Sequence, residues 1–68
     1  MAFRMDQIFI NQCYQTVSGE IRHVTDITPS GEVSFTSIDP DSEAEPVRGK
    51  QTPLKTFADE AERDVPCP

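Results

Sequence analysis

Residues 19–38, GEIRHVTDITPSGEVSFTSI, decide the fold because two β-rich runs lie on either side of one turn signal. The first run is rich in isoleucine, valine and threonine, and the second places Val33 and Phe35 on one side of an extended chain. Pro29-Ser30-Gly31 between the runs is typical of a turn. The stretch therefore predicts two strands joined by a tight turn.

The first of these runs has a spacing that suits a helix better than a strand. Apolar residues recur every three positions from Ile21 to Ile27. A helix is nevertheless disfavoured, because four of residues 24–28 are β-branched and the flanking glycine and proline leave only nine residues between them. In a strand, the same spacing requires either two partly covered faces or a bulge that resets the alternation. We predict a long, bent strand over 20–28.

The chain before this stretch predicts one more strand. Residues 12–17 follow an extended lead-in that begins near Ile8, and they include tyrosine, threonine and valine. Ser18-Gly19 then supplies a tight-turn signal between two β-rich runs. We therefore expect a hairpin that pairs 12–17 with the bent strand.

Residues 39–49 predict a loop. Pro40 and Pro46 block regular pairing, and four acidic residues fall between positions 39 and 45. We expect this acidic loop to be the most mobile part of the domain. A short strand over 50–52 is predicted to follow it.

Residues 52–65 predict a C-terminal helix that ends at Pro66. Apolar side chains fall on one face of this helix: Leu54, Phe57, Ala58, Ala61 and Val65. The face is narrow and partly alanine, so we expect the helix to close an opening of the sheet or to lie along its edge.

These elements predict one small domain over residues 1–68, with a core over about 8–65 and frayed termini. The expected fold class is mainly β (α+β). It is either a small antiparallel SH3-like barrel or a curved meander of three to four strands, with the short C-terminal helix added. The expected core side chains are Ile21, Ile27, Val33 and the four phenylalanines Phe3, Phe9, Phe35 and Phe57.

The combination of Tyr14, a Ser-Gly turn, Ile21-Arg22-x-Val24 and Val33-x-Phe35 resembles small SH3- and Tudor-type barrels. The closing segment PLKTFADEAERDV also resembles small, uncharacterised bacterial and phage-borne proteins of that shape. The resemblance covers about residues 12–65 and rests on turn spacing and apolar alternation. It implies a fold that commonly binds peptides, modified side chains or nucleic acid and is rarely an enzyme, although fold alone does not fix function.

The net charge of −6, from twelve acidic and six basic residues, argues against two classes of partner. Proteins that bind nucleic acid neutralise phosphates with a basic face, whereas the basic residues here are scattered along the chain. The same acidity disfavours an anionic membrane surface. No stretch of the sequence is apolar for long enough to predict a membrane span.

The start of the chain, MAFRMDQIFINQC, lacks the continuous apolar segment of a signal peptide. We therefore expect a cytoplasmic protein in which the thiols of Cys13 and Cys67 stay reduced and unpaired. The alternative is an exported protein with a disulfide between them, which would close a long loop and contribute roughly 4 kcal/mol of stability.

The soft metal ligands of the chain are Cys13, His23 and Cys67. They lack the CxxC or HxxxH spacing of zinc sites, so we expect no shared metal site and no cofactor. Cys13 and His23 on neighbouring strands could form a thiolate–imidazole pair, but we favour a half-buried thiol and a solvent-facing histidine.

The acidic loop has acids at the spacing of a calcium-binding loop over residues 39–50. That loop needs glycine at its sixth position and glutamate at its twelfth, where this chain has Ala44 and Lys50. We therefore expect a solvated acidic loop without calcium.

The favoured function is a non-catalytic interaction module that docks on a protein partner, as an adaptor or an inhibitor, and is itself a monomer or a weak homodimer. The acidic charge makes a basic partner one option. The second hypothesis is a nucleic-acid-associated barrel, with phosphate contacts from Arg22, Arg48, Lys50 and Lys55. An enzyme that uses Cys13 is the least favoured reading. The candidate partner-binding residues are polar side chains of strands and loop: Arg22, His23, Asp26, Asp39, Asp41, Glu43, Glu45, Arg48 and Lys50.

Overall fold

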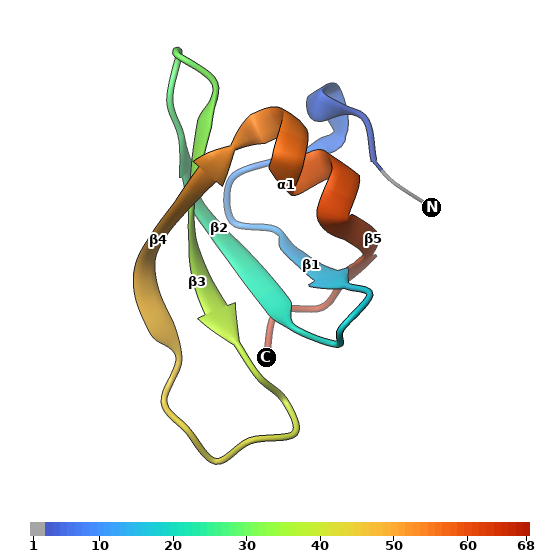
Figure 1. The fold of residues 1–68 in the computed structure, drawn as a ribbon, viewed down its shortest axis with the longest axis vertical. Helices are drawn as coiled ribbons and strands as arrows, with labels where there is room; N and C mark the ends of the chain where they lie inside the picture. Colours follow the sequence, from blue (N-terminus) through green and yellow to red (C-terminus); the bar gives the residue numbers. More distant parts are fainter. Residues whose placement is uncertain (1–2) are drawn as a thin grey trace.

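The computed structural model describes residues 3–68, which form a five-stranded antiparallel sheet, one 3-10 helix and one α-helix (Figure 1). The strands follow one another in the sheet in the order β4-β3-β2-β1-β5. The elements are η1 (Met5–Gln7), β1 (Cys13–Thr16), β2 (Ile21–Ile27), β3 (Glu32–Ile38), β4 (Val47–Pro53), α1 (Leu54–Glu60) and β5 (Ala61–Val65).

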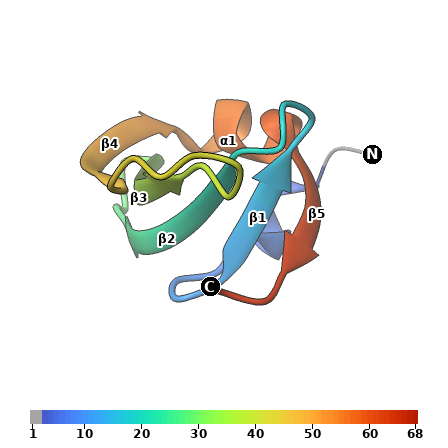
Figure 2. The same cartoon turned by 90° about the horizontal axis from the view of Figure 1, so that it is seen from below.

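The sheet curves around one side of the molecule, and α1 lies within the curve (Figure 2). The prediction of a small, mainly β, antiparallel fold with a short helix is confirmed. The sheet of residues 3–68 is open, because β4 and β5 are its two edges and do not pair with each other. Strands β1 to β4 are neighbours in chain order and form a four-stranded meander, and β5 is an additional fifth strand beside β1 that was not predicted.

A bulge in β2 resolves the three-residue spacing of its apolar side chains. The register with β3 shifts between Val24 and Asp26, so Thr25 is the extra residue on the bulged strand. The Thr25 hydroxyl donates a hydrogen bond to the Ser34 carbonyl oxygen at 3.1 Å. Because of the bulge, Val24 and Ile27 both pack on the core. The predicted bent strand is thus confirmed, and its bend has a defined position.

The β1–β2 and β2–β3 hairpins close with the same five-residue turn, Thr-x-Ser-Gly-Glu. In each turn the glycine N–H donates to the threonine carbonyl oxygen at 3.0 Å, and the threonine and serine hydroxyls lie 2.9 Å apart. Gly19 and Gly31 have φ values of 93° and 92°, a region that L side chains rarely adopt. Both predicted turns are confirmed, and their common sequence is a repeat that the sequence analysis missed.

The core contains a row of aromatic rings packed edge to face. Phe57 of α1 lies between Tyr14 and Phe35, with ring centroids 5.8 Å and 5.4 Å away, and Phe3 packs on Tyr14 at 5.3 Å. The buried apolar cluster consists of Ile8, Tyr14, Val24, Val33, Phe35, Phe57, Ala58 and Ala61.

Two predicted core residues lie elsewhere. Phe9 is 58% exposed, because the backbone between η1 and β1 turns its ring away from the cluster. Ile21 is outside the cluster and pairs across the sheet with Ile38. Val24 takes the central position instead, because it lies three positions after Ile21 along the strand and the two side chains therefore point to opposite faces.

The predicted helix over 52–65 is wrong in its second half. α1 ends at Glu60, and Ala61 has extended angles, φ −71° and ψ 127°. The following residues form β5, which pairs with β1 and so satisfies backbone groups along the outer side of that strand. Local helix propensity is overridden here by non-local strand pairing.

The predicted loop over 39–49 is too long, because β4 begins at Val47 and not at residue 50. The register with β3 shifts between Phe35 and Ser37, and Gly49 has a φ of 74°. The glycine supplies the left-handed conformation that the irregular strand needs, so pairing continues through it. The acidic loop is therefore defined by residues 39–46.

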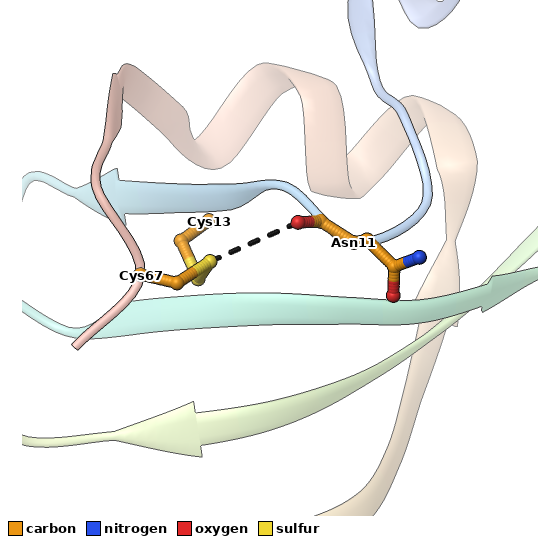
Figure 3. Close-up of a disulfide and its surroundings, with 3 residues drawn as sticks. All are labelled: Asn11, Cys13 and Cys67. Carbon is orange, nitrogen blue, oxygen red and sulfur yellow. Dashed lines mark hydrogen bonds between the residues drawn. A yellow bond between two sulfur atoms is a disulfide. The ribbon is translucent and has the colours of Figure 1, made fainter.

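Cys13 and Cys67 form a disulfide (Figure 3), so the expectation of unpaired thiols is wrong. β5 pairs with β1 in a register that places Val65 opposite Cys13, and the chain then returns over the start of β1. This brings the two Cα atoms to 5.3 Å. A helix over 61–65 would not have brought Cys67 beside Cys13. The C-terminal tail was predicted to fray because the disulfide that attaches it to β1 was not expected. The predicted fraying of residues 1–2 lies outside the described residues.

We predict that Phe57→Ala lowers the free energy of unfolding by about 3–5 kcal/mol, because it removes a fully buried ring and leaves a cavity between α1 and the sheet. Phe9→Ala is the matched control and should change stability by no more than about 0.5 kcal/mol, because that ring is mostly exposed. Denaturant unfolding followed by circular dichroism measures both. Equal losses in the two variants would contradict the placement of α1.

We predict that reduction of Cys13–Cys67 lowers the free energy of unfolding by about 4 kcal/mol, because the bond closes a loop with a sequence separation of 54 residues. The measurement is denaturant unfolding with and without a phosphine reductant, in the presence of a metal chelator. The Cys67→Ser variant is the control, and its stability should not depend on the reductant. A wild-type protein that is equally insensitive would contradict the disulfide.

Candidate functional site

The acidic loop joins β3 to β4 and extends beyond the ends of both strands (Figure 1). Its carboxylates are all exposed, and no ion pair within residues 3–68 involves them. Three local hydrogen bonds shape the loop: Asp41 N–H donates to the Asp39 carboxylate at 3.0 Å, Ser42 N–H donates to the Asp39 carbonyl oxygen at 3.2 Å, and Ala44 N–H donates to the Ser42 hydroxyl at 3.1 Å. The four acids of the loop are Asp39, Asp41, Glu43 and Glu45.

A groove of about 510 Å³ borders this loop. We call it the β2–β4 groove, because its lining comes from β2, β3, β4 and the last loop residue. It combines methyl and ring carbons with a few polar groups, and it is an open trough rather than an enclosed pocket. Its lining residues are His23, Thr25, Thr36, Ile38, Pro46, Arg48 and Gly49.

The groove and the loop bring together six of the nine candidate residues and leave out three. His23 and Arg48 line the groove, and the four acids occupy the adjoining loop. Asp26 lies next to the bulge of β2, and Lys50 pairs across the sheet with Phe35. Both side chains are exposed but outside the groove lining.

Arg22, the remaining candidate, has an internal role. Its side chain is only 14% exposed, and its guanidinium contacts the Glu20 carboxylate at 3.0 Å and the Glu60 carboxylate at 2.8 Å. The same guanidinium lies over the rings of Phe35 and Phe57, at 4.8 Å and 5.6 Å from their centroids. Its charge is therefore neutralised within the fold, and its main effect is to cover one end of the core.

The Cys13–Cys67 disulfide has a histidine beside it. Cys13 and His23 are directly opposite each other on β1 and β2. The two sulfur atoms and a ring nitrogen of His23 lie within 4.8 Å of one another. The expectation of no shared metal site rested on the missing zinc-site spacing in the sequence, whereas the structure brings the three ligand atoms together from three different segments. Such a cluster cannot be predicted from the local spacing of residues in the sequence.

The disulfide decides what this cluster can do in the described state. A bonded sulfur is neither a nucleophile nor a strong metal ligand, so the thiolate–imidazole pair is not present. Cys67 Sγ lies 3.8 Å from the carbonyl oxygen of Asn11, a contact drawn in Figure 3. A disulfide sulfur carries no hydrogen, so this contact can become a hydrogen bond only in the thiol form.

Tyr14 is the other buried polar side chain with a defined environment. Its hydroxyl accepts a hydrogen bond from Phe9 N–H at 3.0 Å and donates one to the Gln7 carbonyl oxygen at 2.9 Å. Burial raises the pKa of Tyr14, the Phe9 hydrogen bond opposes the rise, and the Asp64 carboxylate adds to it. Through its two hydrogen bonds the hydroxyl holds the segment before β1 against the sheet.

Comparison with protein-family models, with curated proteins and with solved structures finds no match for this chain. The resemblance to small SH3- and Tudor-type barrels stays a prediction. Within residues 3–68, no helix is both long enough and apolar enough to cross a membrane.

We predict that the Tyr14 hydroxyl of the folded protein ionises above its ordinary pKa of 10.0. Because the unfolded chain then loses this proton first, the folded state loses stability as the pH rises above 10 through the folded pKa. The chain has one tyrosine, so tyrosinate absorbance reports this group alone. Tyr14→Phe should show a smaller loss of stability over the same alkaline range. A folded-state midpoint at or below the ordinary value would contradict the burial of the hydroxyl.

Proposed function

We propose that this protein is a non-catalytic binding module for an extended, basic segment of another protein, held by the acidic loop and the β2–β4 groove. The observation that supports this function is the juxtaposition of the two features. Four exposed carboxylates, which form no ion pair with any cation in the described part of the chain, adjoin the open groove, and Pro46 belongs to both the loop and the groove lining.

The charge of the loop supplies attraction and selectivity. The protein as a whole carries −6, and four of its acids are concentrated in eight consecutive residues, 39–46. Such a local field speeds the encounter with a basic partner and repels acidic ones. The affinity gained from exposed charges alone is modest and falls with salt.

The groove supplies the contact surface. Ile38 and Pro46 offer apolar area, while the threonines and the backbone of Gly49 offer hydrogen-bonding groups. An open trough suits a chain that passes through it better than a compact ligand that must be enclosed. A short segment in one open groove buries less surface than a standard protein interface, and small interfaces are typical of weak, transient complexes, so we expect micromolar affinity.

The sheet edges support the function less well than the groove does. β4 is interrupted by the irregularity near Gly49 and carries Arg48 and Lys50, and β5 carries a run of charged side chains, Glu62, Arg63 and Asp64. Bulges and charged side chains on an edge strand discourage a further strand from pairing. Docking by strand addition is therefore not our proposal.

Nucleic-acid binding is the weaker alternative. It relied on four basic side chains, of which Arg22 is already paired with two carboxylates. Arg48 and Lys50 share β4, but the acidic loop precedes them directly and would repel phosphate. It enters the experiment below as a competing outcome.

The compartment and the oligomeric state are part of the proposal. A disulfide persists in oxidising compartments, and in the cytoplasm it is usually transient and redox-sensing. We retain the cytoplasm as the compartment and take the disulfide to be transient and redox-sensing there. We also retain a monomer or a weak homodimer as the oligomeric state.

We predict that amide substitution of the four loop acids weakens binding to short peptides that alternate arginine with apolar residues. The control variant neutralises four exposed acids elsewhere, Asp26, Glu32, Asp59 and Glu62. Each set removes four negative charges and changes the net charge from −6 to −2, so only the position of the charges differs. Fluorescence anisotropy should show a loss of roughly tenfold or more at low salt in the loop variant and a much smaller loss in the control.

Equal losses in the two variants would show that net charge alone drives association and would contradict a site on the loop. Peptides with glutamate in place of arginine should not bind either protein. Tight binding of duplex DNA, weakened by Arg48→Ala and Lys50→Ala, would instead support the nucleic-acid alternative.

A further inference from the structure

The cluster of Cys13, His23 and Cys67 has the composition of a zinc site. Its three potential ligand atoms, two sulfurs and one imidazole nitrogen, lie within 4.8 Å of one another. Thiolate and imidazole are the ligands that Zn²⁺ prefers in proteins. No carboxylate belongs to the cluster in residues 3–68, so hard cations such as Ca²⁺ and Mg²⁺ are poorly matched.

Two of the three ligands are held in place by the sheet. Cys13 and His23 are directly opposite each other in the antiparallel β1–β2 pair, which brings their side chains to the same face. Backbone hydrogen bonds fix the strands immediately beside them: Val24 N–H donates to Gln12 O at 3.0 Å, and Asn11 N–H donates to Val24 O at 2.8 Å. This part of the site is preorganised whatever the state of the sulfurs.

Cys67 is the adjustable ligand. It lies in residues 66–68, outside regular secondary structure, and is exposed, whereas Cys13 is fully buried. Ligand atoms of a tetrahedral zinc site are separated by roughly 3.5–3.8 Å, given bond lengths of about 2.0–2.3 Å. The three ligand atoms already lie within 4.8 Å of one another, and the two bonded sulfurs need to move apart to reach the separation found in a zinc site. Because Cys67 lies outside the strands, a local movement of this residue after reduction supplies the change.

We propose that reduction of the Cys13–Cys67 disulfide creates a zinc site in which the two thiolates and the His23 imidazole bind one Zn²⁺. Three protein ligands leave the fourth tetrahedral position to water or to an added ligand. Disulfide and zinc are mutually exclusive at this cluster, so the redox state of the two cysteines decides whether the metal binds.

The chemistry balances with a dithiol as the reductant. Thiol–disulfide exchange breaks the Cys13–Cys67 bond, gives two protein thiols and leaves the dithiol as its own disulfide. Binding of Zn²⁺ then replaces the two thiol protons, which are released to solvent. The reverse reaction, with a disulfide as the two-electron oxidant, re-forms the protein disulfide and expels the metal.

Both the disulfide and a bound zinc ion would connect residues 66–68 to β1. The disulfide does so covalently, and zinc would do so through Cys67 and the two strand ligands. Only the reduced, metal-free protein lacks this connection. Zinc should therefore raise the melting temperature of the reduced protein and leave that of the oxidised protein unchanged.

Cobalt titration tests the site directly, because Co²⁺ replaces Zn²⁺ and gives visible and near-ultraviolet bands. The full chain is reduced with a phosphine, freed of excess reagent without oxygen, and titrated with Co²⁺ and then Zn²⁺. We expect a thiolate-to-cobalt charge-transfer band and tetrahedral d–d bands that saturate at one ion per chain and disappear on addition of Zn²⁺. The oxidised protein should show neither band.

One substitution and a matched control test whether His23 is a zinc ligand. Loss of a hydrogen bond to a ligand weakens metal binding by about 10- to 100-fold, so His23→Ala, which removes a ligand itself, should weaken it by at least about 100-fold. Thr36→Ala is the matched control, because Thr36 is the partner of His23 on β3 and offers no strong zinc ligand. The oxidised form of each variant, still linked by Cys13–Cys67, shows whether the substitution itself permits folding.

Several results would overturn the proposal. One is a reduced protein that gives no charge-transfer band, or that stays unfolded with zinc present. Another is a His23→Ala variant that folds when oxidised and binds zinc as tightly as Thr36→Ala does. A melting temperature of the reduced protein that zinc does not change would have the same effect. None of these outcomes depends on peptide binding, so the zinc site and the proposed function can fail separately.

Discussion

The contact on which the rest of the structure depends is the packing of Phe57 between Tyr14 and Phe35. A chain of 68 residues buries few large side chains, so one ring that touches both hairpins carries a large share of the available apolar burial. The same ring holds the short helix α1 against the sheet, since seven residues are too few to form a stable helix alone. The position of α1 then directs β5 along β1, and β5 returns Cys67 to Cys13. The disulfide and the histidine cluster are consequences of that packing.

The sequence predicted the parts of the fold that local chemistry determines. Both turns rest on a glycine with positive φ, and their Ser-Gly signals lie within the turns themselves. The bend of β2 was predictable because an odd apolar interval requires a bulge or two covered faces. The fate of residues 61–65 was not predictable in this way. Ala-Glu-Arg-Asp suits a helix locally, and only pairing with β1, more than forty residues earlier, favours the strand.

The candidate site also has parts that local sequence predicts and parts that depend on contacts between distant residues. The loop acids could be chosen from sequence because prolines on either side forbid pairing and charged side chains there remain in water. The environment of Arg22 was not predictable from the sequence, since its two carboxylate partners are two and 38 residues away and the rings beneath it come from β3 and α1. A basic residue in a strand looks the same in sequence whether it faces solvent or covers a core. The grouping of Cys13, His23 and Cys67 required the position of the tail, which in turn required β5.

His23 belongs to both of the proposed sites of the molecule. Its side chain lines the β2–β4 groove, and one of its ring nitrogens belongs to the cluster with the two sulfurs. A metal held by that nitrogen would fix the orientation of the ring, which in the disulfide form is set only by packing. An occupant of the groove that contacts the ring would then bind the zinc-bound and the zinc-free reduced protein with different affinity. Thermodynamic linkage requires that such an occupant change the affinity for zinc by the same factor. The small size of the domain would make such coupling direct, because one side chain, His23, lines the groove and also belongs to the cluster with the two sulfurs.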